Sequence, residues 1–318
     1  MRVALFGCGW VQDFHARGVL ERGDELVAVA NHREASAADF ADRHGIAGVT
    51  TDWQALARDP EIDAAIVATP NALHAPQSIA LLEAGTPVLV EKPMAISVAE
   101  CDAMIAAARA SGSSLMVAHC WRFRDEVIRL RDRIAGGELG EIVKTRGYGV
   151  HAEWGPAGWF TDPDLAGGGG LVDMGVHAID TARFLLGDPE PGPVCAAIGT
   201  RYGEYEVDDD AIVLIPWSQG TNSIVESGWW HPHKEGMEAD TEVYGTGGYA
   251  RVFPREEPNE DYEHCTQAMY SAQVAEFLGA VEEGRQPRPS GEDGRVVMVV
   301  VEAAYAAAGR SRPTGSPS

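Results

Sequence analysis

The sequence has little positive charge and no long hydrophobic run. Lys and Arg number 25 against 48 Asp and Glu, which gives a formal net charge of −23. Because such a surface repels nucleic-acid phosphates and anionic membrane surfaces, we expect neither as a partner. No apolar run approaches the ~20 residues of a membrane span, and no secretory signal precedes the first expected strand. We therefore expect a cytoplasmic protein.

Cysteine is also scarce. The five cysteines are widely spaced, odd in number and without a CxxC pair, a pattern typical of reduced thiols. His231 and His233 have no cysteine cluster near them, so we expect no metal site. Two acidic runs, residues 204–210 and 256–263, are interpreted as solvated loops because charge runs usually are.

The remaining composition is that of an ordinary globular protein. A chain of 318 residues, 45% apolar and 23% charged, predicts two domains. Strands and helices alternate through residues 2–118, which indicates a parallel sheet wound on both sides. Short, often alternating runs between residues 142 and 253 indicate an antiparallel sheet, followed by closing helices. We predict domains at residues 1–122 and 123–308 and a flexible tail at 309–318, which has no apolar residue to bury.

A glycine-rich turn follows the first expected strand. Residues 2–6 run into GCGWVQ and then into a helical stretch, the order that a dinucleotide-binding turn requires. Gln12 stands where the fingerprint has its third glycine, and Asp13 adds a negative charge. A tight turn without a ligand is the alternative interpretation. The candidate pyrophosphate contacts are Gly7, Gly9, Trp10 and Val11.

The second expected strand ends about twenty residues later without a carboxylate. Asn31, His32 and Arg33 stand where NAD-binding chains carry an Asp or Glu for the ribose. Arg33 and His32 can pair with a 2′-phosphate, which favours NADP. Asn31 can still bind a ribose hydroxyl, so NAD stays open, and Arg33 can equally be an exposed residue at a helix start.

More polar residues follow the next two expected strands. Thr69, Asn71 and His74 come after residues 64–68, and Glu91 and Lys92 come after residues 87–90. Ligands of open parallel sheets bind beyond the carboxyl ends of the strands. These five residues are therefore further cofactor candidates, and Lys92 is also a candidate catalytic and substrate-binding residue.

A helix is expected at residues 170–186, GLVDMGVHAIDTARFLL. Asp173, His177 and Asp180 are four and three residues apart, so on a helix they share one face. Their neighbours are apolar nearly all the way round, as in a buried helix. In a buried carboxylate–imidazole pair, the imidazole can act as a general base while the carboxylate fixes its orientation. A structural hydrogen bond within the core is the alternative.

Together these motifs resemble the glucose–fructose oxidoreductase, inositol dehydrogenase and rhizopine-catabolism (Gfo/Idh/MocA) family. The matching pieces are GCGWV with His15, TPNALH at 69–74, EKP at 91–93, AHCWRF at 118–123, GGGGLVDMGVHAID at 167–180 and VYGTGGYARV at 243–252. The resemblance implies an α/β fold: an N-terminal Rossmann domain with a doubly wound parallel sheet, then an α+β domain with a large open, mostly antiparallel sheet. One face of that second sheet would make subunit contacts, which implies a homodimer or homotetramer.

The resemblance carries over Lys92, Asp173 and His177 as catalytic residues. Oxidation of a secondary alcohol removes a proton from oxygen while a hydride leaves the adjacent carbon for the nicotinamide. His177 can accept the proton, Asp173 would fix its tautomer, and Lys92 would stabilise the developing alkoxide.

The expected function is hydride transfer between NAD(P) and a sugar, inositol or sugar derivative. An NAD-dependent glycosidase that works by transient oxidation and a non-catalytic cofactor-binding sensor are the alternatives; the presence of all three catalytic candidates speaks against the sensor.

Substrate contacts are drawn from aromatic and polar residues, because apolar sugar faces stack on rings while hydroxyls need hydrogen bonds. Half or more of the aromatic residues are expected in the core or an interface instead. The candidates are Lys92, Arg122, Trp154, Trp159, Asp173, His177 and His231.

Overall fold

The computed structural model describes residues 1–232, 238–253 and 265–310. His233, the acidic run at 256–263 and residues 311–318 of the predicted tail lie outside the described residues. The chain forms two compact units. The first comprises Met1–Cys120 with Thr266–Arg295, and the second comprises the described parts of residues 121–265 and 296–318.

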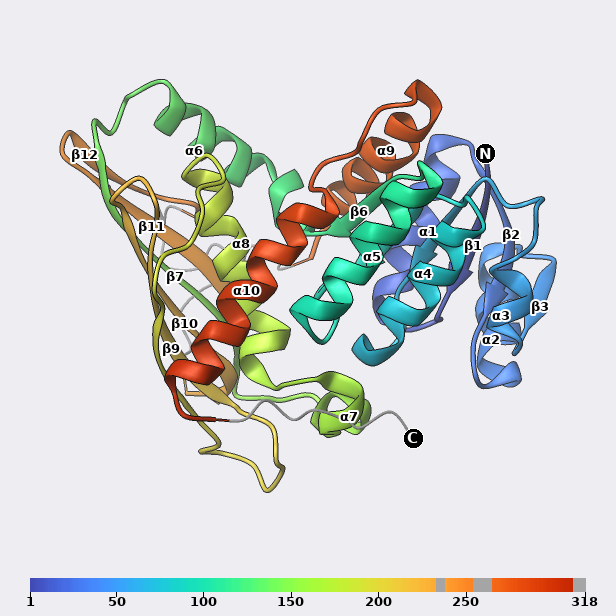
Figure 1. Ribbon diagram of the computed structural model, residues 1–318, viewed down its shortest axis with the longest axis horizontal. Coiled ribbons are helices and arrows are strands. Elements are labelled where there is room, and N and C mark those ends of the chain that lie inside the picture. The colour runs from blue at the N-terminus through green and yellow to red at the C-terminus, as the bar shows by residue number, and fades with distance from the viewer. Residues whose placement is uncertain (233–237, 254–264, 311–318) are drawn as a thin grey trace. The chain divides into compact units, whose positions relative to one another are not determined.

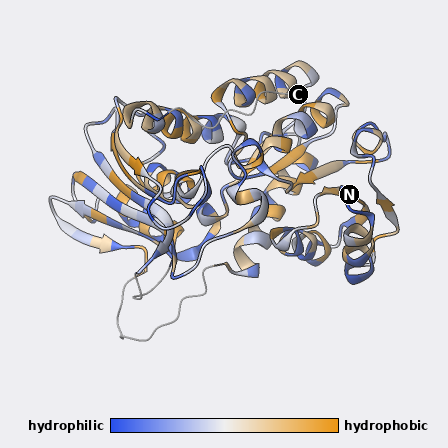
Figure 2. Ribbon diagram, turned by 90° about the horizontal axis from the view of Figure 1, so that it is seen from below, coloured by the Kyte–Doolittle hydropathy of each residue, from blue (hydrophilic) through white to orange (hydrophobic). Residues whose placement is uncertain are grey.

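The first unit is built on a six-stranded parallel sheet. Its order is β3-β2-β1-β4-β5-β6, with every pairing parallel. β4, β5 and β6 are buried along their whole length, as expected of parallel strands covered on both faces. Hydrophobic and hydrophilic residues alternate around the helices and strands in Figure 2. The doubly wound sheet predicted from the alternation is thus confirmed. The strands are β1 (Arg2–Phe6), β2 (Glu25–Ala30), β3 (Gly48–Thr50), β4 (Ala64–Val67), β5 (Val88–Glu91) and β6 (Leu115–Ala118).

The helices of the first unit flank this sheet. From β1 the chain adds β2 and β3 on one side of the sheet, and it then adds β4, β5 and β6 on the other side. Because each crossover is right-handed, the helices that connect the first three strands lie on the opposite face from those that connect the last three. α4 packs against α5, and α9 packs against α1 (Figure 1). The helices are α1 (Trp10–Arg22), α2 (Glu34–His44), α3 (Trp53–Leu56), η1 (Asn71–Leu73), α4 (His74–Glu83), α5 (Val98–Ser111) and α9 (Gln267–Glu283).

The packing of α9 explains why the units differ from the predicted domains. Gly18 of α1 approaches α9 so closely that an added Cβ would lie 3.2 Å from the side chain of Val274. α9 therefore belongs to the first unit although it follows the second in sequence. The first unit also ends at Cys120, two residues before the predicted boundary. A contact between segments some 250 residues apart leaves no local signal.

The second unit contains a six-stranded sheet of order β12-β11-β7-β10-β9-β8. All its pairings are antiparallel except that of β7 with β10. The predicted large, mostly antiparallel sheet is thus confirmed. The parallel pair carries no sequence signal, because alternating burial reports which face is covered and not the direction of the strand. The strands are β7 (Ile142–Ala152), β8 (Cys195–Gly199), β9 (Asp210–Pro216), β10 (Asn222–His231), β11 (Ala239–Gly245) and β12 (Gly248–Arg251).

One face of the second sheet is covered by helices. α8 lies against β7, β10 and β11, and α6 packs on α8 (Figure 1). Along β9 the opposite face exposes Ile212 and Leu214, while Ala211, Val213 and Ile215 are buried. The remaining helical segments are η2 (Cys120–Phe123), α6 (Asp125–Ala135), η3 (Gly158–Thr161), α7 (Pro163–Ala166), η4 (Leu171–Gly175), α8 (Val176–Leu185) and α10 (Gly291–Ala307).

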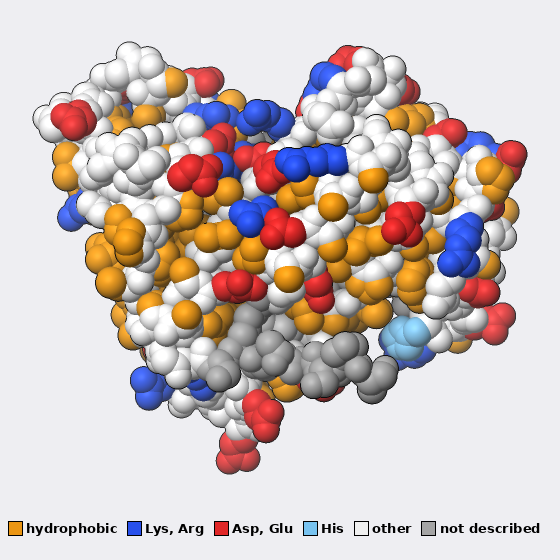
Figure 3. Space-filling model, viewed as in Figure 1, with side chains coloured by type: hydrophobic (Ala, Val, Ile, Leu, Met, Phe, Trp, Pro, Cys, Tyr) orange, Lys and Arg blue, Asp and Glu red, His pale blue; other side chains and the backbone are white. Residues whose placement is uncertain are grey.

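Surface charge is mixed rather than segregated on the face shown in Figure 3. Acidic and basic side chains there are interspersed among apolar ones. Within the three described ranges, no helix is long and apolar enough to cross a membrane.

The acidic run at residues 204–210 is only partly solvated. Glu204 and Glu206 are exposed, but Asp208 and Asp209 are buried. Asp209 accepts hydrogen bonds from the backbone N–H groups of Arg201, at 2.5 Å, and of Tyr202 and Gly203, both at 2.9 Å, and from the Tyr205 hydroxyl at 3.0 Å. The interpretation as a solvated loop is therefore wrong for these two residues, because charge density in sequence does not reveal converging donors.

We expect the substitution Asp209→Ala to lower the free energy of unfolding by about 2–4 kcal/mol, since it leaves buried donors without an acceptor. Urea unfolding followed by circular dichroism measures the change. Glu206→Ala, in the same loop but exposed, is the matched control and is expected to change stability by less than about 0.5 kcal/mol. An equal loss of stability in the two variants would contradict the assignment of Asp209 as the acceptor of these buried hydrogen bonds.

Candidate active site

The candidate cofactor-binding residues and Lys92 lie along one edge of the first sheet. Gly7, Asn31, Thr69 and Lys92 follow β1, β2, β4 and β5 within two residues. Because these strands are parallel, their carboxyl ends meet at the same edge. The strand order reverses between β1 and β4, which is the position where ligands of doubly wound sheets bind.

The glycine turn has the geometry of a pyrophosphate site. Gly7 has φ of +94°, and an added Cβ would lie 2.3 Å from the carbonyl oxygen of Ala68, so only glycine fits there. An added Cβ at Gly9 would meet nothing within 4 Å, which leaves space beside the turn. α1 begins at Trp10 with no capping side chain, so its first N–H groups can bind an anion. The turn therefore fits a dinucleotide.

The two departures from the fingerprint have structural explanations. Gln12 is fully buried and its amide donates to the carbonyl oxygen of Ile66 at 3.3 Å, so it fills the contact between α1 and β4. The Asp13 carboxylate is paired with Arg43 and with His44 Nε2. Burial would raise the pKa of Asp13, but the hydrogen bonds from His44 and Arg43 outweigh it and lower the pKa. The negative charge in the first turn is thus compensated.

The residues after β2 are open to a ligand. His32 and Arg33 are exposed, and Arg33 precedes the first residue of α2. The Asn31 amide donates to the carbonyl oxygen of Arg33 at 3.1 Å, which stabilises the bend between β2 and α2. This arrangement presents a guanidinium where the adenosine ribose of a bound dinucleotide is expected.

The turn that carries Lys92 is held by buried polar groups. His15 Nε2 lies 2.8 Å from Glu91 Oε1. The two ring nitrogens of His74 lie 2.8 Å from the carbonyl oxygens of Pro93 and Thr69, and burial lowers the pKa of this imidazole. Glu91 and His74, predicted as cofactor contacts, therefore have partners within the protein.

The other two candidates on this edge, Thr69 and Asn71, lie close to these groups in sequence. The Thr69 hydroxyl donates to Gln77 at 2.7 Å. Asn71 is buried in η1.

The candidate catalytic residues of the second unit begin with a π-helical turn. η4 (Leu171–Gly175) carries Asp173 and leads into α8, which carries His177. The regular helix expected at 170–186 is thus wrong at its start. Gly175 permits the wider turn, because an added Cβ would lie 2.7 Å from Leu171 Cδ1 and 2.9 Å from Ser227 Oγ. Single π turns inside helices are frequent at functional sites.

The glycine run before η4 is held by Asp208. Its carboxylate accepts hydrogen bonds from the N–H groups of Gly169 and Leu171, both at 2.9 Å, and from the hydroxyl of Tyr305. Burial raises the pKa of Asp208. An added Cβ at Gly169 would lie 1.8 Å from the Asp208 carbonyl oxygen, so the close approach requires glycine. The start of η4 is therefore fixed by a buried carboxylate.

Asp173 has partners on two strands. Trp229 Nε1 donates to its Oδ2 at 3.0 Å, and His151 Nε2 lies 3.3 Å from the same oxygen. The second ring nitrogen of His151 lies 3.2 Å from Glu238 Oε2. Burial alone would lower the pKa of His151, but the bonds to Asp173 and Glu238 outweigh it and raise the pKa. The side chains of Asp173, His151 and Glu238 thus form a row in which the imidazole lies between two carboxylates. The predicted bond between Asp173 and His177 stays a prediction.

Aromatic side chains gather where β7 and β10 end. Trp154 stacks on His151 with ring centroids 3.7 Å apart, and the backbone N–H of Trp230 donates to the Trp154 carbonyl at 2.9 Å. Glu153 and Trp230 adopt left-handed φ values of 63° and 61°, which is unusual for side chains of this size. The Glu153 N–H donates to the carbonyl of His231 at 3.0 Å.

Of the predicted substrate contacts in the second unit, Trp154 and His231 thus come together. Trp159 stacks instead on its neighbour Phe160 in η3, with ring centroids 3.8 Å apart.

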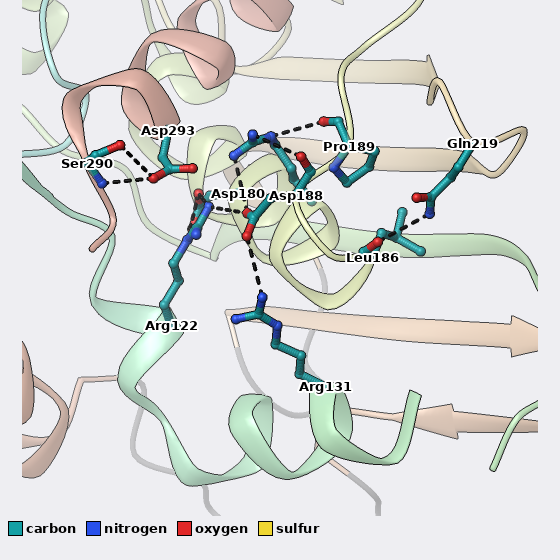
Figure 4. Close-up of polar contacts among 10 residues, drawn as sticks. Arg122, Arg131, Asp180, Leu186, Asp188, Pro189, Gln219, Ser290 and Asp293 are labelled. Carbon is teal, nitrogen blue, oxygen red and sulfur yellow. Dashed lines mark hydrogen bonds and ion pairs between the residues drawn. The ribbon is translucent and has the colours of Figure 1, made fainter. Parts of the chain in front are cut away.

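Arg122, also predicted as a substrate contact, has a structural role. Its guanidinium is buried and bonds Asp180 through Nε at 2.8 Å and Nη2 at 2.7 Å, with Asp188 at 3.0 Å. Arg131 approaches Asp188 at 3.5 Å (Figure 4). Because its guanidinium is bonded to these carboxylates, Arg122 holds Asp180 and Asp188 in place, and its predicted contact with a substrate stays a prediction.

Sequence reasoning missed three of these polar residues, His151, Asp208 and Glu238, and named His15 only as part of the family motif. A signal exists for His151, because it continues a row of small buried residues, Thr145, Gly147 and Gly149, on one face of β7. No group of three or more His, Cys, Asp or Glu in the described ranges is arranged to hold a metal ion.

Comparison with known proteins places these features in a class. The family described as an oxidoreductase family with an NAD-binding Rossmann fold matches residues 1–119, and the GFO/IDH/MocA C-terminal domain matches residues 127–251. The protein is thus an NAD(P)-dependent oxidoreductase of the two-domain type. It belongs to the Gfo/Idh/MocA family, as the motifs predicted.

Individual relatives and solved structures agree with this membership. The chain is 30% identical over 285 residues to 1,5-anhydro-D-fructose reductase of Ensifer adhaerens, covering 86% of this chain and 85% of the relative. It is 33% identical over 272 residues to D-glucoside 3-dehydrogenase of Escherichia coli K12, covering 80% and 77%. The structure of GenD2 from gentamicin A biosynthesis in complex with NAD superposes with a TM-score of 0.86 at 28% identity, covering 97% and 94%.

We expect His151→Gln to destabilise the protein more at low pH than at high pH. Because the pKa of His151 is raised on folding, its ion pairs stabilise the fold fully below the unfolded value of ~6.5 and cease to do so as the pH rises through the folded pKa. The substitution is expected to lower the free energy of unfolding by about 1–2 kcal/mol at pH 5.5 and by clearly less at pH 9. Urea unfolding at both pH values measures it, with the exposed His32→Gln as control. An equal loss at both values would refute the ion-pair assignment.

Proposed function

We propose that this protein transfers a hydride between NAD(P) and a secondary alcohol or ketone of a sugar or sugar derivative. The observation that carries the proposal is the glycine turn with open space at Gly9 on the same sheet edge as Lys92. The names of the relatives, a reductase of anhydrofructose and a dehydrogenase of glucosides, support a carbohydrate substrate. So does the matched structure of a levoglucosan dehydrogenase with NADH and levoglucosan, at 25% identity and a TM-score of 0.84.

Lys92, Asp173 and His177 would divide the chemistry among them. The bound nicotinamide supplies the hydride acceptor or donor. His177 would take the hydroxyl proton during oxidation, and the Lys92 ammonium would stabilise the negative charge that develops on that oxygen. Asp173 would keep a fixed negative charge beside them, because Trp229 and His151 hold its carboxylate. In the reduction of a ketone the steps run in reverse, and His177 would donate the proton to the oxygen.

The exposed rings at the ends of β7 and β10 suit a sugar. Trp154 and Trp230 are 45% and 41% exposed, although indole rings bury most of their surface in ordinary cores. The apolar face of a pyranose can stack on such a ring. We assign Trp154 and His231 to substrate contact on this basis, and leave Trp159 as a weaker candidate.

For the catalytic assignment, we expect Lys92→Met and His177→Asn to lower kcat by a factor on the order of 10² to 10⁴. NADH binding, followed by its fluorescence, is expected to stay within about threefold. The assay records absorbance of reduced nicotinamide with levoglucosan, D-xylose, methyl glucosides and myo-inositol.

The same assay separates the alternatives. Sugar release without accumulated reduced cofactor would indicate the glycosidase. Tight cofactor binding without turnover of any sugar would indicate the sensor.

For the cofactor, we propose that Arg33 pairs with a 2′-phosphate, so that NADP is preferred. Arg33→Ser is then expected to raise the Kd of NADPH at least about tenfold, because a charge-assisted pair is lost. The Kd of NADH is expected to stay within about twofold. Arg58→Ser is a control on a different loop of the same unit. If NADH bound more tightly than NADPH to the unsubstituted protein, NAD would be the cofactor.

For the assembly, we propose that the uncovered face of the second sheet makes the subunit contact of a homodimer or homotetramer. Ile212 and Leu214 are 52% and 40% exposed there, and exposed apolar groups of this kind mark interaction surfaces. Light scattering after size exclusion is expected to give two or four times the 34.0 kDa chain mass. Ile212→Arg is expected to shift the species toward a single chain, whereas Glu204→Arg is not.

A further inference from the structure

Glu91 is a carboxylate fixed at both of its oxygens. His15, which is fully buried on α1, has its Nε2 2.8 Å from Oε1. Since a carboxylate only accepts, the histidine nitrogen is the donor. Oε2 accepts the backbone N–H of Lys92 at 3.0 Å. Burial would raise the pKa of Glu91, but the hydrogen bond from His15 outweighs it and lowers the pKa. The group therefore stays ionised and keeps both bonds.

Pro93, which follows Lys92, is also held by a buried histidine. The carbonyl oxygen of Pro93 lies 2.8 Å from His74 Nδ1, and the other nitrogen of this ring lies 2.8 Å from the carbonyl oxygen of Thr69. His74 is 1% exposed. Lys92 itself is only half-buried, so its flanking backbone is fixed while its side chain can reach a ligand.

The hydrogen bonds on both sides of Lys92 connect its loop to the glycine turn after β1. α1, which carries His15, begins directly after Gly9. Thr69, which His74 contacts, lies so close to Gly7 that an added Cβ there would be 3.2 Å from Thr69 Cγ2. Three loops of the first sheet, those after β1, β4 and β5, are thereby linked through two buried histidines.

We propose that His15, acting through Glu91, is a positioning residue that fixes Lys92 relative to the cofactor-binding turn. The inference rests on the proposed function, in which Lys92 stabilises charge on the reacting oxygen. Displacement of a catalytic group by about 1 Å can cost on the order of a hundredfold in rate. A carboxylate attached to the peptide N–H of the lysine itself is placed to prevent such a displacement.

The experiment measures the position of Lys92 without requiring a substrate. The chain has three lysines, Lys92, Lys144 and Lys234, so trace acetylation followed by peptide mass spectrometry resolves each amine. Lys144 is exposed on β7 in the second unit and serves as the internal standard. The quantity compared is the ratio of the labelling rates of Lys92 and Lys144, measured on the full chain without cofactor.

Three variants distinguish positioning from mere stability. In His15→Gln the amide nitrogen can replace Nε2 as donor, and the ratio is expected to stay within about 1.5-fold. In His15→Leu, which leaves a buried carboxylate unpaired, the ratio is expected to rise at least threefold. The double variant His15→Leu with Glu91→Leu removes the buried charge, which often restores stability. Its ratio is also expected to rise at least threefold, because the bond to the Lys92 N–H is lost.

A control removes a comparable histidine–carboxylate pair that joins α2 to α1. His44 bonds Asp13 of α1 at 2.6 Å, but neither residue touches the Lys92 turn. His44→Leu is expected to lower stability while the labelling ratio stays at the wild-type value. A rise in this variant equal to that in His15→Leu would show a general loosening of the unit and would overturn the proposal.

Activity supplies the second readout. With whichever sugar the unsubstituted protein oxidises, the double variant is expected to lose about ten- to a hundredfold in kcat, while KM for the sugar stays within about twofold. His15→Gln is expected to recover most of the rate. Unchanged kcat and an unchanged labelling ratio in the folded double variant would refute the positioning role. If no sugar is oxidised, the proposed function fails, and the labelling ratio still decides whether the pair fixes Lys92.

Discussion

The buried carboxylate of Asp208 is the constraint on which the positions of Asp173 and His177 in the second unit depend. It binds the backbone of Gly169 and Leu171 on one side and the hydroxyl of Tyr305 on the other, and it thereby fixes where η4 starts. Asp173 and His177 follow within six residues. Because the turn is made of glycines pressed against other backbone, its position cannot adjust by side-chain motion alone. Asp208, which binds backbone and a tyrosine hydroxyl, thus determines where the candidate catalytic residues Asp173 and His177 lie.

The two units share a common construction. In each, parallel strands end at one edge, and the polar side chains beyond them are held by a buried imidazole and a buried carboxylate. In the first unit His15 and Glu91 play these parts, and in the second His151 lies between Asp173 and Glu238. Pairs of this kind are costly to bury unless both members are bonded. Their presence near the ends of the strands, rather than in the centre of the core, is consistent with a role in positioning.

Much of the fold could be predicted because its signals are local. The glycine turn and the alternation of strand and helix through residues 2–118 are encoded within a few residues at a time, and the first strand lies at the expected residues 2–6. The motifs GCGWV, EKP and DMGVH likewise identified the family, which the comparisons confirm.

What could not be predicted depends on residues far apart in sequence. Asp173 meets Trp229, which is 56 residues away, and also His151. Asp209 binds N–H groups only six to eight residues away, but composition does not show that the loop folds back onto this carboxylate. Arg122 was predicted as a substrate contact because it is a polar residue among aromatic ones, but its carboxylate partner, Asp180, is 58 residues away. Spacing reveals which side chains share a helix face and not which partner another element brings to them.

The π turn sets the angular phase of the helix that follows it. Each residue of a regular α-helix turns the chain by about 100°, so a chain lacking one residue between Leu171 and Gly175 could form an unbroken helix of the same amphipathic quality. Every side chain before the deletion would then be rotated by about that angle relative to His177. The carboxylate of Asp173 would face away from the indole of Trp229, and the helix would be intact while the constellation was lost. Length in this segment is therefore as strongly constrained as the identity of its residues.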